Sequence, residues 1–263
     1  MYTIHLPVTV LSGFLGAGKA TLLAASSRDY SRRLVAAQPS NWQQCKARRN
    51  GDVAVVSARG LSMARGRGRL FDDIDLDLRP GTITGILGRS FCGKTSLGNA
   101  LLGLIPSAGG TVCRASAILP LRFRKLWRVP SSAFARKMTA GNELQALARL
   151  QGGGWQRMDR LRQRLRLSAD LLDRLPGHVS GGEVQRSALM RAQTVDPVFL
   201  VADEPTSRLG LITRQEVIEM PGEVVREESL AILVISHNGE LFKRFCGHVV
   251  KLDDRPAMAR HGN

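Results

Sequence analysis

The chain has 263 residues, 43% of them hydrophobic, which is enough for one large α/β domain or two small ones. Its formal net charge of +16 fits an anionic membrane surface, a nucleic acid or an arginine-rich proteome. The basic residues are scattered and only 5% of residues are aromatic, so a base-stacking platform for nucleic acid is not expected. No apolar run has the length of a membrane span, and the cysteines form no C-x-x-C pair, which predicts reduced thiols in a cytosolic protein without a zinc site.

The first 51 residues carry a near-match to a phosphate-binding loop. Gly13-Phe-Leu-Gly-Ala-Gly-Lys19-Ala20 follows a strand candidate and resembles the opening of the CobW-type metal-chaperone GTPases. Ala20 stands where the Mg²⁺-binding Ser or Thr belongs, and the segment is too short for a doubly wound GTPase fold. We interpret residues 1–51 as a non-functional appendage with a degenerate loop and a linker, with weak phosphate binding as the alternative.

A second domain is predicted over residues 52–263, opening with β-strands. Residues 53–57, four apolar residues followed by a serine, indicate a strand. Residues 71–78 alternate strictly: Ile74, Leu76 and Leu78 would face a core, and the aspartates between them would face water. This segment is therefore expected to be an antiparallel strand with one solvated face.

A phosphate-binding loop follows the apolar strand candidate 82–87. Gly88-Arg-Ser-Phe-Cys-Gly-Lys94-Thr95 fits G-x-x-x-x-G-K-[ST] and leads into a predicted helix. Free backbone N–H groups and the helix dipole would together make an anion site. Lys94 is expected to contact the β- and γ-phosphates of a nucleotide and Thr95 to bind Mg²⁺. The predicted nucleotide contacts here are Gly88, Arg89, Ser90, Phe91, Cys92, Gly93, Lys94, Thr95 and Ser96.

Helical spacing of apolar residues dominates the next part of the chain. It is present in residues 142–150 and again at Met158, Leu161 and Leu165. We predict a largely helical subdomain over 114–176, inserted into the α/β core and extending to about residue 190, where a further helix runs to about residue 194.

Two continuous apolar runs, 197–202 and 230–235, are typical of parallel strands covered on both faces. The first ends in Asp-Glu-Pro-Thr, starting at Asp203, and the second in Ser-His-Asn, around His237. The carboxyl ends of parallel strands converge on the ligand crevice of such sheets. Asp203 is therefore expected to hold Mg²⁺, and Glu204 to orient or deprotonate an attacking water.

The order of these motifs resembles the ATP-binding subunit of ABC transporters, over residues of about 52–255. The resemblance implies an α/β P-loop NTPase with a parallel core sheet, an antiparallel β portion and the inserted helical subdomain. It makes Glu204 and His237 the catalytic residues, with His237 at the γ-phosphate, and ATP and Mg²⁺ the cofactors. By the same resemblance, the signature motif binds the γ-phosphate of ATP held by a second subunit; its residues are Ser180, Gly181, Gly182 and Glu183.

Three positions depart from the family pattern. Trp127 or Arg128 falls where a glutamine senses the γ-phosphate and the membrane partner. Ala64 and Arg65 stand where an aromatic residue stacks on adenine, and Gly210 replaces an aspartate in the loop after the Asp-Glu pair. These departures bear on coupling, base affinity and communication across a dimer, whereas the hydrolytic residues are complete.

The sequence therefore predicts an ATP-hydrolysing subunit of an ABC importer, peripheral at the cytoplasmic face of the membrane. Its expected partners are membrane permease subunits and a second ATP-binding subunit, and a solute-binding protein is a further candidate. Residues 131–139 and 244–250 resemble the nickel and oligopeptide uptake class, so the expected cargo is nickel, a metal chelate or a peptide. The alternatives are a degenerate subunit that hydrolyses ATP poorly, a DNA-linked soluble ABC ATPase, and a metal chaperone using residues 1–25.

Overall fold

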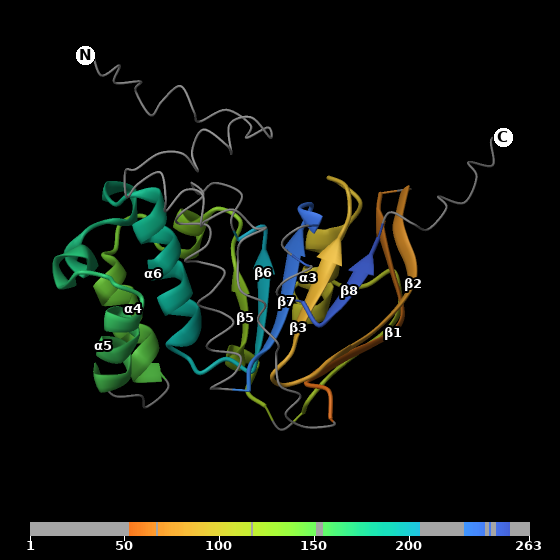
Figure 1. The fold of residues 1–263 in the computed structure, drawn as a ribbon, viewed down its shortest axis with the longest axis horizontal. Coiled ribbons are helices and arrows are strands. Elements are labelled where there is room, and N and C mark those ends of the chain that lie inside the picture. Colours follow the sequence, from red (N-terminus) through yellow and green to blue (C-terminus); the bar gives the residue numbers. More distant parts are fainter. Residues whose placement is uncertain are drawn as a thin grey trace, which may run out of the picture.

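The computed structural model describes residues 53–66, 68–116, 118–150, 155–205, 229–239, 242 and 246–252. The predicted appendage with its degenerate loop, and the departure at Gly210, lie outside the described residues. The described part holds two sheets, a helix between them and a group of helices at one end (Figure 1).

The central sheet is parallel and has the strand order β5-β6-β7-β3-β8. Strand β6 is buried at every position, and β7 at all but one, which confirms the prediction of parallel strands covered on both faces. The strands are β5 (Phe123–Leu126), β6 (Phe199–Asp203), β7 (Ala231–Ser236), β3 (Ile83–Leu87) and β8 (His248–Lys251).

The second sheet is antiparallel, with the order β2-β1-β4. In β2 the predicted alternation is confirmed, because Ile74, Leu76 and Leu78 are buried and the aspartates between them are exposed. The strand expected at 53–57 begins later, at residue 56, and runs further. The strands are β1 (Val56–Arg65), β2 (Gly68–Leu78) and β4 (Gly109–Arg114).

Helix α3 (Lys94–Leu102) lies between the two sheets and joins them into one core. Leu97 and Leu101 on this helix are fully buried, in a cluster that also contains Val56 of β1 and Ile86 of β3. The helix that begins at the phosphate loop is therefore held from both sides, which gives the loop a rigid base.

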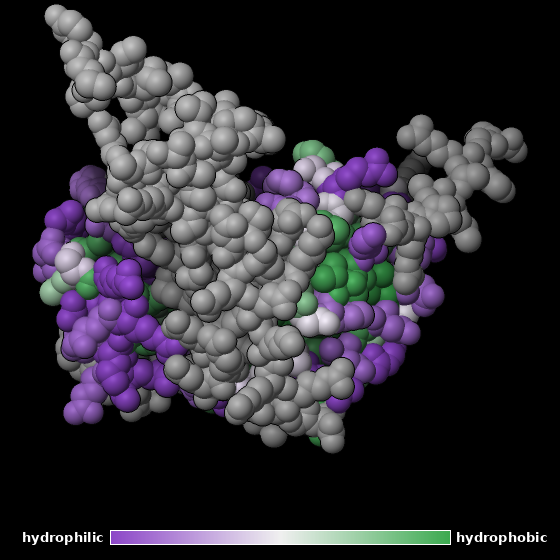
Figure 2. Space-filling view, in the orientation of Figure 1, coloured by the Kyte–Doolittle hydropathy of each residue, from purple (hydrophilic) through white to green (hydrophobic). Residues whose placement is uncertain are grey.

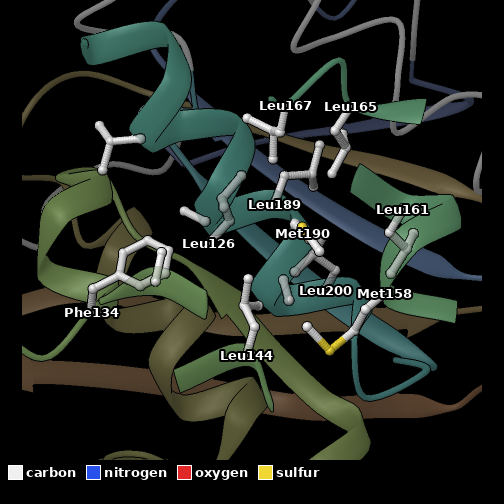
Figure 3. Close-up of a cluster of buried hydrophobic side chains, with 14 of the residues drawn as sticks. Leu126, Phe134, Leu144, Met158, Leu161, Leu165, Leu167, Leu189, Met190 and Leu200 are labelled. Atoms are coloured by element: carbon white, nitrogen blue, oxygen red, sulfur yellow. The ribbon is translucent and has the colours of Figure 1, made fainter. Parts of the chain in front are cut away.

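Three helices gather beside the β5 edge of the central sheet: α4 (Ala140–Leu150), α5 (Trp155–Arg164) and α6 (Gly181–Gln193) (Figure 1). Their apolar faces meet in one cluster, in which Leu144, Met158 and Leu189 pack with Leu126 and Leu200 of the sheet (Figure 3). The outer side of this helical group is covered by hydrophilic residues (Figure 2). Four short 3-10 helices connect these elements; they span Pro120–Arg122, Pro130–Ala133, Ala169–Asp173 and Pro176–His178.

One element within the predicted helical region is a strand of the central sheet. Residues Phe123–Leu126 form β5, which pairs in parallel with β6, so the expectation of a largely helical segment from residue 114 was wrong at this point. The strand has only four residues, and two of them, Arg124 and Lys125, are basic. So short a strand carries no periodicity signal, and its conformation follows from pairing with β6.

The bulge between β1 and β4 leads to a first prediction, which concerns the stability of the fold. Their register shifts between Arg59 and Ser62, and Gly110 lies opposite with φ 77°, where an added Cβ would be 2.3 Å from the carbonyl oxygen of Gly60. We expect Gly110→Ala to lower the free energy of unfolding by at least about 2 kcal/mol, because it combines a left-handed backbone with a backbone clash. Gly177→Ala is the control, since its Cβ would meet nothing within 4 Å. Equal urea midpoints for the two variants would contradict this account of the bulge.

Candidate functional site

Three neighbouring strands of the central sheet end at the same edge. In the register of the sheet, Leu87 at the end of β3 pairs with Ser236 of β7, and Ile235 of β7 pairs with Asp203 at the end of β6. The phosphate loop follows β3, Glu204 follows β6 and His237 follows β7. Parallel pairing thus brings the predicted nucleotide, metal and catalytic residues to one place.

The phosphate loop curls around the side chain of Lys94. The ammonium Nζ donates hydrogen bonds to the carbonyl oxygens of Gly88 and Arg89, each at 2.6 Å, and the residue is buried. Phe91 and Gly93 have φ 69° and 98°, and these left-handed residues bend the loop back over the ammonium group. A Cβ at Gly93 would lie 2.9 Å from Cβ of Leu70, so only glycine fits there. Phe91 itself projects into solvent, at 93% exposure.

The beginning of α3 is suited to an anion. The helix has no side-chain cap at Gly93 and no acidic residue in its first turn. A helix N-terminus normally leaves backbone N–H groups that need an acceptor, and it carries partial positive charge. Together with the adjacent ammonium of Lys94, this terminus fits the phosphates of a nucleotide.

An oxygen pair that fits Mg²⁺ lies next to the loop. Thr95 Oγ1 donates a hydrogen bond of 3.2 Å to Oδ1 of Asp203, although the two residues are 108 positions apart in the chain. Asp203 is only 4% exposed. Hydroxyl and carboxylate oxygens are the ligands that Mg²⁺ prefers, so the predicted metal ligands are side by side in the fold.

Glu204 is held in a fixed orientation by the end of β7. Its Oε1 accepts a hydrogen bond of 3.0 Å from the backbone N–H of His237 and lies 2.7 Å from Nδ1 of the same residue. Its Oε2 accepts a hydrogen bond of 3.1 Å from the hydroxyl of Ser236. Glu204 has φ 48°, an unfavourable conformation for a non-glycine residue that costs of order 1 kcal/mol and is retained here by these contacts.

Two residues at this edge were not predicted from the sequence. Ser236 binds the carboxylate of Glu204, and only its position beside His237 could have indicated it. Lys125 has its ammonium Nζ 3.7 Å from Oδ2 of Asp203. Burial lowers the pKa of Lys125, and the negative charge of Asp203 partly opposes that shift. Lys125 was not predicted because the strand that carries it, β5, was expected to be part of a helical region.

The signature motif lies at the beginning of α6, where its side chains accept hydrogen bonds from its own backbone N–H groups. Ser180 accepts a hydrogen bond from the backbone N–H of Glu183, while the Glu183 carboxylate accepts one from the backbone N–H of Ser180 at 2.9 Å. Gly181 has open space around its Cβ position. The same helix is tied to the chain just after β6, because Nε2 of Gln185 donates to the carbonyl oxygen of Pro205 at 2.9 Å.

Two of the family departures lie in the described residues. Trp127 and Arg128 come directly after β5, which pairs with β6, so the position of the missing glutamine is next to the strand that ends in Asp203. Ala64 and Arg65 are exposed at the end of β1.

A phosphate loop between a parallel strand and a helix, with acidic residues at the end of the neighbouring strand, defines a P-loop nucleoside triphosphatase. The profile of the ABC transporter family matches residues 71–207 of this chain. A nickel import ATP-binding protein of Rhodospirillum rubrum is 30% identical over 216 residues, covering 76% of this chain and 77% of that protein. A provisionally named peptide import ATP-binding protein of Brucella ovis is 30% identical over 221 residues, covering 76% of this chain and 70% of its own length. The chain therefore belongs to the ABC transporter family, as an ATP-binding subunit of the ATPase class.

Solved structures support the same fold. The chain is similar to the ATP-binding subunit of an ABC transporter with a TM-score of 0.66 and 20% identity, over 76% of this chain and 86% of that one. It is also similar to an ATP-binding cassette solved as a dimer with ADP and phosphate, with a TM-score of 0.65 and 19% identity, over 76% and 94% of the two chains. The predicted fold class is thereby confirmed.

The capping box of α6 leads to a prediction on how the free energy of unfolding depends on pH. The pKa of Glu183 is held below its ordinary value of 4.5 by the hydrogen bonds of Ser180, from its side chain first and its backbone second. A depressed carboxyl pKa stabilises the fold above pH 4.5, and this contribution is lost as the pH falls through the lowered pKa. Glu183→Gln should therefore cost less than about 1 kcal/mol at pH 7, because the group is well solvated, and nothing in acid. Urea unfolding at both pH values measures this difference.

The comparison variant for this prediction is Ser180→Ala, which removes the uncharged half of the box. It should cost about 1 kcal/mol at pH 7 and less in acid, because the same hydroxyl is the largest cause of the lowered pKa of Glu183 and that coupling is lost when the carboxyl is protonated. A Glu183→Gln penalty that persists unchanged in acid would show that the charge of Glu183 has no part in the cap.

Proposed function

We propose that this protein is the ATP-hydrolysing subunit of an ABC importer whose cargo is nickel, a metal chelate or a peptide. The observation that carries the proposal is the meeting of Lys94, Thr95, Asp203 and Glu204 at one sheet edge, in a chain whose relatives are import ATP-binding proteins. None of the helices in the described ranges has the length and apolar character of a membrane span. The proposed partners are membrane permease subunits, with this subunit peripheral at their cytoplasmic side.

Binding of ATP would replace contacts within the protein by contacts with the nucleotide. The ammonium of Lys94 would leave the carbonyl oxygens of the loop for the β- and γ-phosphate oxygens, and the backbone N–H groups of α3 would donate to the same phosphates. Thr95 and Asp203 would hold Mg²⁺, which supplies charge neutralisation for the phosphates. Each contact is charge-assisted, so the loop is a specific site for polyphosphate.

Hydrolysis would use Glu204 as the base for the attacking water. The water oxygen bonds to the γ-phosphorus, the bond to the leaving oxygen of ADP breaks, and the proton of the water passes to the Glu204 carboxylate. Ser236 and the backbone of His237 hold that carboxylate in place. The His237 side chain is 61% exposed and would leave its contact of 2.7 Å with Oε1 of Glu204 to turn toward the γ-phosphate.

The signature motif has its role in a dimer. We infer that Ser180, Gly181 and Gly182 contact the γ-phosphate of ATP bound to a second subunit, because small residues at a helix N-terminus let backbone N–H groups approach an anion. The capping box of Ser180 and Glu183 is the arrangement of this motif in a single subunit. One solved cassette of the same fold is a dimer, which supports this inference.

Comparing the two phosphate loops tests the assignment of the nucleotide site. Lys94→Ala should abolish ATP binding, since a charge-assisted phosphate contact contributes about 1.5–3 kcal/mol and the loop also loses its organising ammonium. Lys19→Ala removes the corresponding lysine of the degenerate loop and should leave ATP affinity within about twofold. A titration with a fluorescent ATP analogue measures both variants. The reverse pattern would move the nucleotide site to residues 13–20.

Glu204→Gln tests the proposed base. The substitution keeps size and hydrogen bonding but removes the proton acceptor, so turnover should fall by about 10²–10⁴-fold while ATP affinity is kept. An ATP-bound dimer should then accumulate, as followed by size-exclusion chromatography with ATP and Mg²⁺. If Glu204→Gln stays monomeric with ATP, and adding Gly210→Asp does not change this, the proposed dimer mechanism is wrong.

A further inference from the structure

Lys125 presents a buried positive charge to the carboxylate that is expected to hold Mg²⁺. Asp203 has two carboxylate oxygens, and each has a different neighbour. Oδ1 accepts the hydrogen bond of Thr95, whereas Oδ2 lies 3.7 Å from Nζ of Lys125. The side chains of Lys125 and Asp203 are only 7% and 5% exposed, so solvent screens this pair far less than a surface ion pair.

The ammonium group of Lys125 is held where it is. It donates a hydrogen bond of 2.7 Å to Oδ1 of Asn99 on α3, and it lies 4.6 Å from the centre of the Trp127 ring. Both contacts favour a positive charge, the first through an amide oxygen and the second through the face of the aromatic ring. The side chain is therefore anchored beside Asp203 by a residue of the phosphate-loop helix and by Trp127, which follows its own strand.

A fixed cation at this place opposes a second cation on the same carboxylate. Two positive charges a few ångströms apart repel each other strongly where water is largely excluded. Lys125 also neutralises part of the negative charge that would attract a divalent ion. Metal binding at Thr95 and Asp203 must overcome both effects. The ammonium of Lys94, by contrast, is bound to the carbonyl oxygens of Gly88 and Arg89, so its proposed contacts with phosphate do not depend on the charge of Lys125.

We propose that Lys125 is a built-in counter-charge to Asp203 that weakens the divalent-cation site and makes nucleotide binding largely independent of Mg²⁺. This inference rests on the proposed function, because it takes residues 88–96 as the ATP site. A lysine with a purely structural role would act in the opposite direction: by orienting Asp203 it would help the metal to bind.

The test measures how much the metal adds to nucleotide affinity. For the full chain, the dissociation constant of a fluorescent ATP analogue is determined in EDTA and in excess Mg²⁺. The value in EDTA divided by the value in Mg²⁺ is the Mg²⁺ ratio, and it is compared between variants. The Mg²⁺ ratio of the wild type should be within about threefold of one. Lys125→Met, which keeps a similar side-chain length without the charge, should raise this ratio about tenfold. Lys125→Arg keeps the charge and should leave the ratio near that of the wild type.

A second variant and a second readout cover a loss of folding. Lys125→Gln can still donate an amide N–H to Asn99 and should change the ratio in the same direction as Lys125→Met. Both variants leave Asp203 without its counter-ion, so their thermal midpoints in EDTA should be lower than that of the wild type. Addition of Mg²⁺ and the analogue should raise the midpoints of the variants by more than it raises that of the wild type.

The outcomes separate this inference from the proposed function. A Mg²⁺ ratio that is unchanged or lower in Lys125→Met and Lys125→Gln overturns the counter-charge and identifies Lys125 as a positioning residue for Asp203. Absence of analogue binding to the wild type in both EDTA and Mg²⁺ overturns the nucleotide site itself, and this inference with it.

Discussion

The parallel pairing of β3, β6 and β7 is the constraint on which the rest of this structure depends. Parallel strands place their carboxyl ends at a common edge, and the register aligns Leu87, Asp203 and Ser236 at that edge. The chain at and just beyond these strand ends supplies different chemical groups: the ammonium of Lys94 after β3, a pair of carboxylates at the end of β6 and the imidazole of His237 after β7. Burial of all positions of β6 opposes any slip of this register, because a slip would move apolar residues out of the core.

The functional groups at this edge are already satisfied by one another. Lys94 is bound to loop carbonyls, Thr95 to Asp203, and Glu204 to Ser236 and His237. Buried polar groups without partners are costly, so these contacts stabilise the site before any ligand arrives. A ligand therefore has to exchange contacts rather than fill vacant ones, and its affinity reflects the difference between the two sets. Lys125 fits the same picture, as the partner that keeps the second oxygen of Asp203 from being a buried, unpaired charge.

The helical group and the sheet form one mechanical unit. The cluster around Leu144, Met158 and Leu189 packs directly on β5 and β6 (Figure 3). In addition, Gln185 of α6 donates a hydrogen bond to the carbonyl oxygen of Pro205, two residues after Asp203. A displacement of α6 would thus be transmitted to the end of β6, where the acidic pair lies. Under the proposed function, this connection is a physical route between the signature motif and the residues proposed for hydrolysis.

The sequence by itself determined the motifs, their order, and the class of fold and protein. A G-x-x-x-x-G-K-[ST] loop, an alternating strand such as β2 and an apolar strand ending in Asp-Glu are local patterns whose periodicity and composition can be read directly. Only the tertiary structure decided that Phe123–Leu126 is a strand, that Lys125 faces Asp203, and that Ser236 binds Glu204. These features depend on contacts between residues 32 to 78 positions apart, and no local pattern encodes which distant side chain will lie opposite a buried charge.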